Sequence, residues 1–507
     1  MIGMTRFAHG TPIYRTEEIR RIEAIAAAQS DAPQLMQRAG LAAAELAREL
    51  AISGKRVLVI AGPGNNGGDA LVVARHLKSW WFKVDVMFTG DAARLSPDAA
   101  AAYRDWQAAD GHFLTAVPAA HACGLIVDGL FGIGLERELT GRYAELVAWM
   151  NNSSGPILAL DVPSGLESDS GRVLGGAVRA SDTITFIALK PGLLTLNGPD
   201  HCGTLHLATL GLDAPALMPA CGRVIGREVL STGLRRRRIN THKGDYGSVA
   251  IIGGASGMLG AALLAGRAAL KVGAGRVYVG CMAENAPAVD SVQPELMLRT
   301  ADQILALDHL ACLAVGPGLG QTDKACALLT AALGSPLPLV LDADALNLLA
   351  QHSALRTPLL FRTAPTLLTP HPAEAARLLG TTTPAVQAER VAAALKLAEM
   401  HRCGVVLKGA GSILAWPDGR WAVNSSGNPG MASAGMGDVL TGILAALLAQ
   451  GADALTALEC GVYLHGAAAD ALAQSGVGPV GLTASDVIDA ARRLLNAMER
   501  EDDEVTR

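Results

Sequence analysis

The residues best suited to chemistry in this chain of 507 residues include the tetrad Gly435-Met436-Gly437-Asp438, which opens a predicted helix. Glycine N–H groups at a helix start can hold a phosphoryl group during its transfer. An aspartate beside them can accept the proton of an attacking hydroxyl. The tetrad therefore indicates phosphoryl transfer. The plainer alternative is a capped helix that follows a loop ending in glycine.

Three more loops of the second half carry groups that suit a nucleotide site. Lys408-Gly-Ala-Gly-Ser412 follows a predicted strand, where it could contact phosphates, and Gly316-Pro-Gly-Leu-Gly320 is a second glycine loop. Thr369-Pro-His371-Pro-Ala-Glu374 places an imidazole and a carboxylate at a strand end. Each group has a structural alternative: a solvated strand end for Lys408, a structural histidine for His371, and helix caps for Asp342 and Asp344.

The first half contains a different glycine loop, Gly62-Pro-Gly-Asn-Asn-Gly-Gly-Asp69, between a predicted strand and a predicted helix. It fits the pattern G-x-G-x-x-G, in which glycines let the backbone approach a phosphate. A Rossmann dehydrogenase also needs an acid about 20 residues further on, at the end of the next strand. Asp85 lies inside that strand and Asp91 lies beyond its end. The Asn65-Asn66 pair is also unusual for that fold.

Oxygen-bearing side chains lie at three predicted strand ends of the first half. Asn66 belongs to the glycine loop, Asp128 ends a second strand, and Asp161 and Ser164 follow a third. Because the carboxyl ends of parallel strands line one crevice, we expect these side chains to converge. Ligands that are all oxygen suit a hard cation rather than zinc. For any single aspartate, the alternative is a cap or a turn.

Alternating strands and helices must position these groups. In the first half, apolar runs predict strands at residues 56–61, 83–88, 124–128, 156–161 and 183–187, and helical patterns lie at 70–79, 96–109 and 141–150. In the second half, strands are predicted at 248–253, 276–280, 311–316, 337–342, 366–369 and 404–407, before a helix-rich tail at 438–498. This alternation predicts an α/β protein, with a parallel sheet in the first half and a second α/β unit in the second half.

The pattern breaks at residues 215–239, so we expect domains at residues 1–224 and 225–507. The break contains two prolines, several glycines and the successive arginines Arg235, Arg236, Arg237 and Arg238. We expect the arginines to belong to a solvated linker, and a contact with a phosphate or a partner is the alternative.

Composition and charge exclude several classes of protein. The net charge of −5, from 42 basic and 47 acidic residues, provides no basic field for nucleic acid. The uncharged run at 246–266 is interrupted by glycines, so no membrane span is expected, and residues 1–29 lack an apolar signal core. The eight cysteines form no Cys-x-x-Cys pair. Reduced thiols in a soluble, cytoplasmic protein are expected.

The motifs of the first half resemble the NAD(P)H-hydrate epimerase domain. LMQRAG (35–40), PGNNGGD (63–69), VDGLFGIG (127–134), DVPSG (161–165) and TITFIALKPG (183–192) occur in this order. The resemblance covers residues 11–210 and departs at Ala70, where the family often has glycine. It implies a Rossmann-like parallel sheet that interconverts the R and S epimers of NADH or NADPH hydrated on the nicotinamide ring.

The motifs of the second half resemble ADP-dependent NAD(P)H-hydrate dehydratase. THKGDYG (241–247), IIGGASGMLGA (251–261), GAGRV (273–277) and NPGMASAGMGDVLTGI (428–443) join the loops described above. This resemblance covers residues 227–495. It implies a ribokinase-like α/β domain that dehydrates the S epimer with ADP and yields NAD(P)H, AMP and phosphate. The whole chain thus resembles the bifunctional NAD(P)H-hydrate repair family, both isomerase and lyase.

The resemblance also implies roles for residues of the first domain. Asp161 would be the acid/base catalyst. The hydrated dinucleotide would be bound by Asn65, Asn66, Gly67, Gly68, Asp69, Gly132, Ile133, Gly134, Leu135, Glu136, Arg137, Glu138 and Asp161. Asn66, Asp128 and Ser164 would hold a potassium ion, K⁺.

In the second domain, the resemblance implies that Asp438 is the catalytic base. ADP, the co-substrate, would contact Lys408, Gly409, Ala410, Gly411, Ser412 and Gly437. The hydrated dinucleotide would contact Ala261, Gly320, His371 and Asp438, with Ala262 as the alternative to Ala261. Mg²⁺ is expected here too. The partners would be small molecules, NADH hydrate or NADPH hydrate and ADP, with no nucleic acid and no membrane; a homo-oligomer is compatible with this.

Other functions remain open from the residues themselves. A ribokinase-like small-molecule kinase, with a nucleotide-binding scaffold as its N-terminal domain, would share the tetrad but phosphorylate a stable alcohol with ATP. A dehydrogenase would oxidise or reduce its substrate with NAD. A non-enzymatic scaffold is the third alternative, because a related N-terminal domain is an interaction module in mRNA decapping. Asp161 and the intact DVPSG argue against the scaffold.

Overall fold

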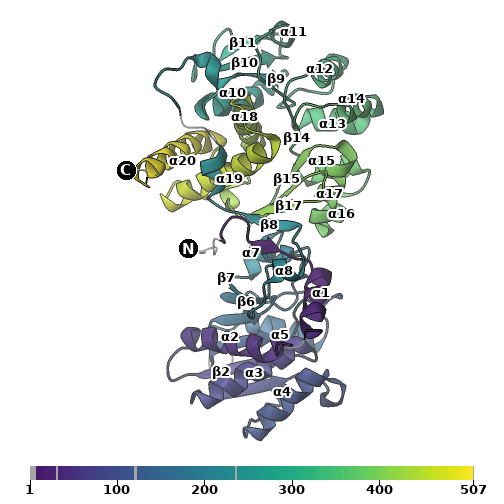
Figure 1. The fold of residues 1–507 in the computed structure, drawn as a ribbon, viewed down its shortest axis with the longest axis vertical. Coiled ribbons are helices and arrows are strands. Elements are labelled where there is room, and N and C mark those ends of the chain that lie inside the picture. The colour runs from purple at the N-terminus through teal and green to yellow at the C-terminus, as the bar shows by residue number, and fades with distance from the viewer. Residues whose placement is uncertain (1–6, 30–31, 119–122, 234–236, 506–507) are drawn as a thin grey trace. The chain divides into compact units, whose positions relative to one another are not determined.

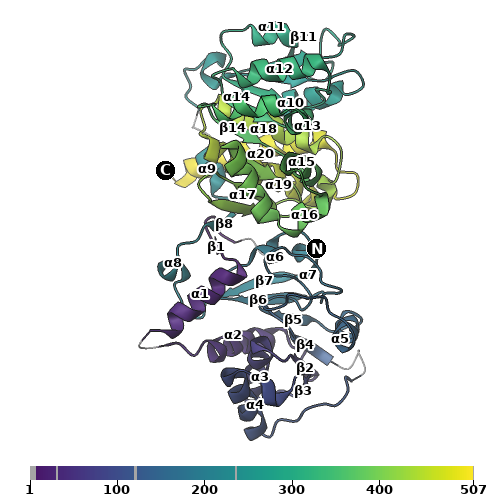
Figure 2. The same ribbon diagram turned by 90° about the vertical axis from the view of Figure 1, so that its right-hand side faces the viewer.

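The computed structural model describes residues 7–29, 32–118, 123–233 and 237–505. The chain forms two compact units, one that includes Thr11–Gly222 and one that consists of Ala8–Gly10 and the residues from Arg223 onward. Each unit contains one sheet with helices packed against it (Figures 1 and 2). Among the described residues, no helix is both long and apolar enough to cross a lipid bilayer.

The sheet of the first unit is parallel throughout, as predicted. Its strands lie in the order β3 (Val84–Phe88), β2 (Arg56–Ala61), β4 (Cys123–Gly129), β5 (Ile157–Leu160), β6 (Asp182–Phe186) and β7 (Thr204–Ala208). Because β2 lies between β3 and β4, the order of the strands reverses beside it. Such a switch point opens a crevice beyond the carboxyl ends of the strands.

Both faces of this sheet are covered, which explains the continuous apolar runs of its strands. Val57, Val59 and Ala61 share a core with α1 (Thr16–Ala27), α2 (Leu35–Leu50), α3 (Asn65–Ser79) and α4 (Pro97–Ala108). Leu58 and Ile60 point to the opposite face and share a core with α5 (Arg142–Asn151). Because successive side chains of β2 point to opposite faces, one strand contributes to the apolar cores on both sides of the sheet.

The sheet of the second unit is parallel at its centre and antiparallel toward one edge. Its order is β8 (Gly222–Ile225), β17 (Trp421–Asn424), β16 (Ser412–Ala415), β15 (Gly404–Leu407), β14 (Thr366–Leu368), β13 (Leu339–Leu341), β12 (Cys312–Val315), β9 (Ser248–Gly253), β10 (Arg276–Cys281) and β11 (Met297–Thr300). The strands β15, β16 and β17 pair with one another in antiparallel order. The α/β class with two sheets is therefore confirmed.

Helices flank this second sheet on both sides (Figure 1). One side carries α10 (Leu259–Lys271), α18 (Met436–Ala449), α19 (Ala454–Gln474) and α20 (Ala484–Val505), whose apolar residues share one large core. The other carries α12 (Asp323–Leu333), α13 (Asp344–Gln351), α15 (Pro372–Leu379), α16 (Thr383–Ala388) and α17 (Arg390–His401). The predicted helix-rich tail is thus three separate helices.

The arginine run is only partly a solvated linker. Arg235 and Arg236 lie outside the described residues. Arg237 donates a hydrogen bond of 2.6 Å to the carbonyl of Gly273, and its guanidinium lies 3.8 Å from the centre of the Tyr246 ring. Arg237 is exposed, as the linker interpretation expects, although its side chain also rests on Gly273 and Tyr246.

Helices α10 and α18 approach each other through small residues. A Cβ added to Gly442 of α18 would lie 2.0 Å from the carbonyl oxygen of Ala265 in α10. This close contact fixes the position of α18, the helix that begins with Met436, Gly437 and Asp438.

We therefore expect Gly442→Ala to destabilise the chain by about 1–3 kcal/mol or more, because the methyl group overpacks the contact between the helices. Gly260→Ala is the matched control, since a Cβ there has no atom within 4 Å. It should be neutral or stabilising by about 0.4–1 kcal/mol. Urea unfolding measures both, and equal stability of the two variants would contradict the assigned contact.

Candidate active sites

The first turn of α18 is an uncapped helix start. Gly435 precedes it in the left-handed conformation, with φ of 88°, and no described side chain accepts a hydrogen bond at this cap. By contrast, Thr322, His371 and Asp453 cap α12, α15 and α19. A long helix with unpaired N–H groups and the positive end of its dipole is suited to an anion. The alternative of an ordinary capped helix is therefore wrong.

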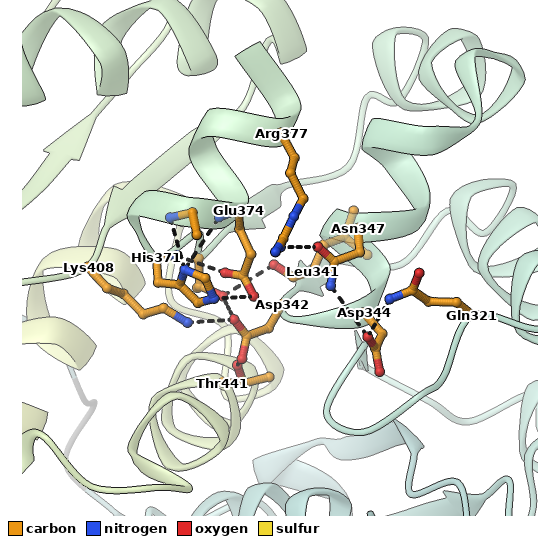
Figure 3. A network of polar contacts seen from close by, with 12 residues as sticks. Gln321, Leu341, Asp342, Asp344, Asn347, His371, Glu374, Arg377, Lys408 and Thr441 are labelled. Carbon is orange, nitrogen blue, oxygen red and sulfur yellow. Dashed lines mark hydrogen bonds and ion pairs between the residues drawn. The ribbon is translucent and has the colours of Figure 1, made fainter. Parts of the chain in front are cut away.

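A buried ion pair lies directly behind this turn. Asp342, which follows β13, and Lys408, which follows β15, are joined through Oδ1 and Nζ at 2.8 Å (Figure 3). A Cβ added to Gly437 would lie 3.1 Å from that Nζ. Asp342 also accepts hydrogen bonds from Thr369 at 2.7 Å and from Thr441 of α18 at 3.0 Å. This carboxylate thus connects the ends of β13, β14 and β15 to α18.

Each member of this pair keeps the other charged. Burial acts to raise the pKa of Asp342, but the ammonium of Lys408 and the hydrogen bonds outweigh it, so the pKa lies below its usual value. Burial acts to lower the pKa of Lys408, but the carboxylates of Asp342 and Glu374 outweigh it, so the pKa is raised. The pair therefore stays ionised at neutral pH.

Asp438 lies beside the pair, in the first turn of α18. Burial raises the pKa of Asp438 to about 7, and the carboxylates of Asp342 and Glu374 add to this while Lys408 opposes it. A carboxylate with a pKa near 7 can accept and release a proton at neutral pH. Asp438 is therefore suited to act as a general base beside an anion bound at the helix start.

His371 and Glu374 form a reciprocal cap at the start of α15. Nδ1 of His371 accepts hydrogen bonds from the N–H groups of Ala373 at 3.1 Å and Glu374 at 3.4 Å. Glu374 Oε2 accepts from the His371 N–H at 2.8 Å, and its Oε1 lies 3.2 Å from Nε2. The Nδ1 atom of His371 therefore has a structural role, because it caps α15. The ring is half-exposed, so its surface remains accessible to a ligand.

The second glycine loop is held by Asp344. The N–H of Gly320, a left-handed residue with φ of 77°, donates to Asp344 Oδ2 at 2.9 Å. Gln321 and Asn347 donate to its Oδ1, and Arg377 in turn donates to Asn347 at 2.8 Å (Figure 3). Asp344 therefore holds the Gly316–Gly320 loop in place by hydrogen bonds.

Of the two candidate alanines at the start of α10, only Ala261 has accessible surface. Ala262 is fully buried, whereas Ala261 is half-buried. A Cβ added to Gly318 would lie 3.4 Å from the Cβ of Ala261, so the helix and the second glycine loop are neighbours. Ala261 and Gly320 thus belong to one region of the second unit.

The loop 408–412 is exposed at its tip. Gly409 and Gly411 both have positive φ, of 140° and 62°. Gly409 and Ala410 are exposed, and the hydroxyl of Ser412 donates to the carbonyl of Gly409 at 3.1 Å. Since Lys408 reaches Asp342 behind Gly437, one lysine connects this loop to the α18 start.

In the first unit, α3 begins at Asn65, five residues earlier than the predicted 70. The reason lies in the glycines: a Cβ on Gly67 would lie 2.0 Å from the carbonyl oxygen of Gly62, and one on Gly62 would lie 1.8 Å from that of Leu130. The glycine pattern thus allows the helix to pack on the loop. No side chain of the described residues caps this helix, so the turn from Asn65 to Asp69 is uncapped too, as are the starts of α2, α5, α10 and α13.

Asp161 follows β5 with a left-handed backbone, at φ of 64°. Its Oδ1 accepts a hydrogen bond of 2.5 Å from Lys190, whose side chain is only 1% exposed. Lys190 also donates to the Thr185 hydroxyl and the Phe186 carbonyl, both at 2.8 Å. A Cβ on Gly132 would lie 3.1 Å from the other oxygen, Oδ2. Asp161 thus presents one oxygen to Lys190 and one to the 132–138 segment.

Asn66 and Asp128 differ in their hydrogen bonding. The amide nitrogen and oxygen of Asn66 are buried, and neither has a hydrogen-bond partner among the described residues. Asp128 is fully buried and accepts from the Ser164 hydroxyl at 2.6 Å and the Ser164 N–H at 2.9 Å. Burial raises the pKa of Asp128 to about 6, although these hydrogen bonds oppose the rise. A buried carboxylate with only neutral partners and an unpaired amide oxygen suit a cation.

The segment from Gly132 to Glu138 is not uniformly accessible. Leu135 is buried in the core that contains Leu130 and Leu146, so only its backbone is available to a ligand. Gly134, Glu136, Arg137 and Glu138 are exposed, and Gly132 and Ile133 are half-buried. The structure thus brings Asn66, Gly132 and Asp161 together.

Sequence reasoning missed several residues of both sites. Lys190 stands in the KPG sequence after β6, a strand-end position like that of Lys408, and that position was the available signal. Glu23 of α1 has a raised pKa through burial and the charge of Asp161. Burial and Asp161 also raise the pKa of Asp69 well above its usual value. No local signal pointed to Glu23, because α1 is distant in sequence.

Two family models match the chain. The model described as YjeF-related protein N-terminus matches residues 32–192, and the model described as NAD(P)H-hydrate dehydratase matches residues 249–493.

Known proteins are similar to the chain over nearly its whole length. The bifunctional NAD(P)H-hydrate repair enzyme Nnr of Coxiella burnetii is 39% identical over 96% of this chain and 100% of that protein. The enzyme of the same name from Escherichia coli is 39% identical over 91% of this chain and 89% of its own length. Among solved structures, the ADP/ATP-dependent NAD(P)H-hydrate dehydratase from Bacillus subtilis, co-crystallised with ATP and Mg²⁺, is 32% identical, with a TM-score of 0.49, over 54% of this chain and 98% of that one.

The raised pKa of Asp438 predicts a pH-dependent cost in stability. Between its ordinary value near 4 and its native value of about 7, the unfolded state loses a proton that the native state keeps. Native stability therefore falls as pH rises through this window. We expect Asp438→Asn to stabilise the chain more at pH 8 than at pH 5, as measured by urea unfolding. Asp323→Asn, at an exposed aspartate in the first turn of α12, is the control, and an equal gain at both pH values contradicts the assignment.

Proposed function

The chain belongs to the family of bifunctional NAD(P)H-hydrate repair enzymes, and we propose that residues 1–224 carry the epimerase and residues 225–507 the dehydratase. The chain repairs hydrated NADH and NADPH, by interconverting the R and S epimers and by dehydrating the S epimer with a nucleotide as co-substrate. The structural observation that most supports the proposed dehydratase site is Asp438 beside the uncapped start of α18.

In the proposed dehydration, ADP is the phosphoryl donor. Asp438 accepts the proton of the C6 hydroxyl as that oxygen attacks the β-phosphorus, and the bond from this phosphorus to the bridging oxygen breaks to release AMP. The N–H groups of the first α18 turn stabilise the charge of the transferred phosphoryl group. Lys408, fixed by Asp342, supplies a positive charge behind Gly437.

The phosphorylated hydroxyl then departs as phosphate. The lone pair of the ring nitrogen expels it, the C6–O bond breaks, and loss of a proton from C5 restores the C5–C6 double bond of NAD(P)H. In this scheme Gly409, Ala410, Gly411 and Ser412, together with Lys408 and Gly437, bind ADP. Ala261, Gly320 and His371 contact the hydrated dinucleotide.

Mg²⁺ is proposed to enter with the nucleotide. Among the described residues, no group of three or more His, Cys, Asp or Glu side chains could hold a metal ion. This fits Mg²⁺, which proteins usually bind through one or two carboxylates together with substrate phosphates. Asp438 is the carboxylate that would face it, and the ion would neutralise charge on the phosphates.

In the proposed epimerisation, Asp161 is the acid/base group. C6 of the hydrate bears a hydroxyl and a ring nitrogen, so proton transfer to the hydroxyl lets the nitrogen lone pair expel water. Return of water to the opposite face of the planar carbon gives the other epimer. Lys190 keeps the Asp161 carboxylate in one orientation, and the 65–69 turn and the 132–138 segment would hold the dinucleotide.

K⁺ is proposed to bind at Asn66, Asp128 and Ser164. The unpaired amide oxygen of Asn66 and the buried carboxylate of Asp128 fit a cation. Their mixed, weakly charged oxygen donors suit a large monovalent ion better than Mg²⁺, which demands tight octahedral geometry. The ion would supply positive charge that orders this end of the crevice.

The alternative of a ribokinase-like kinase with a scaffold domain is not supported. The relatives that match both halves of the chain are named as bifunctional repair enzymes. The dehydrogenase alternative also lacks its ribose-binding acid, since Asp85 is bound to Arg56 at 2.9 Å. We also propose a cytoplasmic location, because all eight cysteines are free thiols, as a reducing compartment would keep them.

Asp438→Asn tests the dehydratase assignment. We expect the rate of dehydration to fall about 10²–10⁴-fold, because a general base is lost while the N–H groups that bind phosphate remain. ADP affinity by calorimetry and epimerisation by the same protein should stay close to wild type. The assay follows recovery of NADH absorbance from purified S epimer with ADP. Asp323→Asn is the matched control, and full turnover by Asp438→Asn removes this residue from the mechanism.

Asp128→Asn tests the cation. With wild type, K⁺ in place of a bulky organic cation at constant ionic strength should increase both the epimerisation rate and the melting temperature. The variant should lose both responses, because it keeps the shape of the side chain but removes its charge. Its dehydration of S epimer should continue, since that reaction is assigned to the other domain. An epimerase indifferent to K⁺ would contradict the site, and loss of both activities would contradict the division of the chain.

A further inference from the structure

Arg390 is a buried cation without a carboxylate partner. It begins α17 and is 2% exposed, and no ion pair joins it to any described acidic residue. Its position in the first turn also opposes the helix dipole, which favours acidic groups there. Burial lowers the pKa of Arg390 to about 10, so the side chain is still charged at neutral pH.

The guanidinium of Arg390 lies directly under the loop 408–412. Nη2 donates to the carbonyl oxygens of Leu407, Lys408 and Gly411 at 3.3, 3.4 and 3.3 Å. A Cβ added to Gly409 would lie 2.9 Å from Nη1, and the φ of 140° at Gly409 is a conformation that side chains rarely adopt, so glycine suits the loop at this position. Nη1 is bound to Gln387 at 2.7 Å, whereas Nε has no partner among the described residues.

The hydrogen bond from Arg390 to the Lys408 carbonyl determines which way the peptide group between Lys408 and Gly409 faces. In a trans peptide the C=O and the following N–H point in opposite directions. Because the Lys408 carbonyl turns inward to Arg390, the N–H of Gly409 turns outward. The N–H groups of Gly409, Ala410 and Gly411 donate no hydrogen bond to a described residue, and the loop tip is exposed. Outward N–H groups between residues of positive φ form an anion-binding concavity.

We propose that Arg390 is a positioning residue of the nucleotide site: it draws the carbonyls of Lys408 and Gly411 inward, so that the N–H of Gly409 faces the phosphates of ADP. The phosphates then provide the negative charge that the fold does not place beside Arg390. This inference rests on the proposed function, which assigns ADP to that loop. It adds a residue from α17 that touches neither substrate.

Arg390→Leu and Arg390→Lys test the proposal in the full chain. We expect Arg390→Leu to raise the Kd and KM for ADP by about tenfold or more, while kcat at saturating ADP and KM for NADH hydrate change by less than about twofold. Arg390→Lys keeps the charge but loses the planar fork of donors, so it should raise the Kd of ADP by about threefold. Calorimetry with ADP and steady-state assays measure these values.

Arg362→Leu is the matched control. Arg362 is also a partly buried arginine that binds carbonyls, those of Ala332, Leu333, Ser335 and Leu337, but it is remote in sequence from the loop. Its loss should lower the melting temperature and leave the Kd of ADP within about twofold of wild type. If Arg362→Leu weakens ADP binding as much as Arg390→Leu, affinity merely follows stability and the proposal fails.

The remaining outcomes are also decisive. Folded Arg390→Leu with wild-type affinity for ADP overturns the role of Arg390 and leaves the proposed function intact. If Arg390→Leu does not fold, Arg390→Lys decides, and an unchanged Kd overturns the proposal. Wild-type protein that binds no ADP contradicts the proposed function and this inference together.

Discussion

The candidate site of the second unit depends on the ion pair between Asp342 and Lys408. A carboxylate taken out of water must be paired and hydrogen-bonded, and Asp342 meets this need with a lysine and two threonines from β14, β15 and α18. Satisfying one buried charge therefore fixes the relative position of three strand ends and a helix start. Removal of one partner would leave the other charge buried and uncompensated, so separating these elements costs free energy.

The N-terminal unit solves a similar problem in a different way. There too an aspartate just beyond a central parallel strand is held by a buried lysine, but Asp161 and Lys190 follow the adjacent strands β5 and β6. Asp161 also adopts a left-handed backbone, which aspartate tolerates better than most residues. In the second unit Asp342 is almost wholly buried, and the acid with accessible surface is Asp438. Under the proposed roles, the first unit uses a Lys–Asp pair to hold the acid/base group Asp161, and the second uses one to hold the surroundings of Asp438.

Much of the fold was predictable because buried parallel strands are short apolar runs that end in glycine loops. The central strands of both sheets appear where these runs lie, and the loops at their ends supply both candidate sites. The hairpin of β16 and β17 was missed, although strands as short as β13 and β14, of three residues each, were predicted. The start of α3 was placed too late because Gly67 and Gly68 disfavour a helix by propensity, while close packing on Gly62 favours glycine there.

The candidate sites were less predictable than the fold. Residues within glycine loops, such as Asp438 and Lys408, could be selected from local pattern. Asp342 could not be separated from a helix cap, because its importance comes from Lys408 and Thr441, which are 66 and 99 residues away. Glu23 and Arg390 belong to helices that carry no motif, and only the tertiary packing brings them to a site. Long-range electrostatics is therefore the part of the site that sequence pattern does not contain.

At the uncapped start of α18, a bound ligand can accept the backbone hydrogen bonds that no side chain accepts. In the free protein the amides of this turn are satisfied by water, so they should exchange their hydrogens with solvent faster than the amides of the capped turns of α12 and α19. A bound phosphate would take the place of the missing capping side chain. The lifetime of the folded chain in a cell would then track the local concentration of nucleotide, because a ligand that binds only the native state stabilises it by mass action. An enzyme of this kind would be most resistant to turnover where its co-substrate is most abundant.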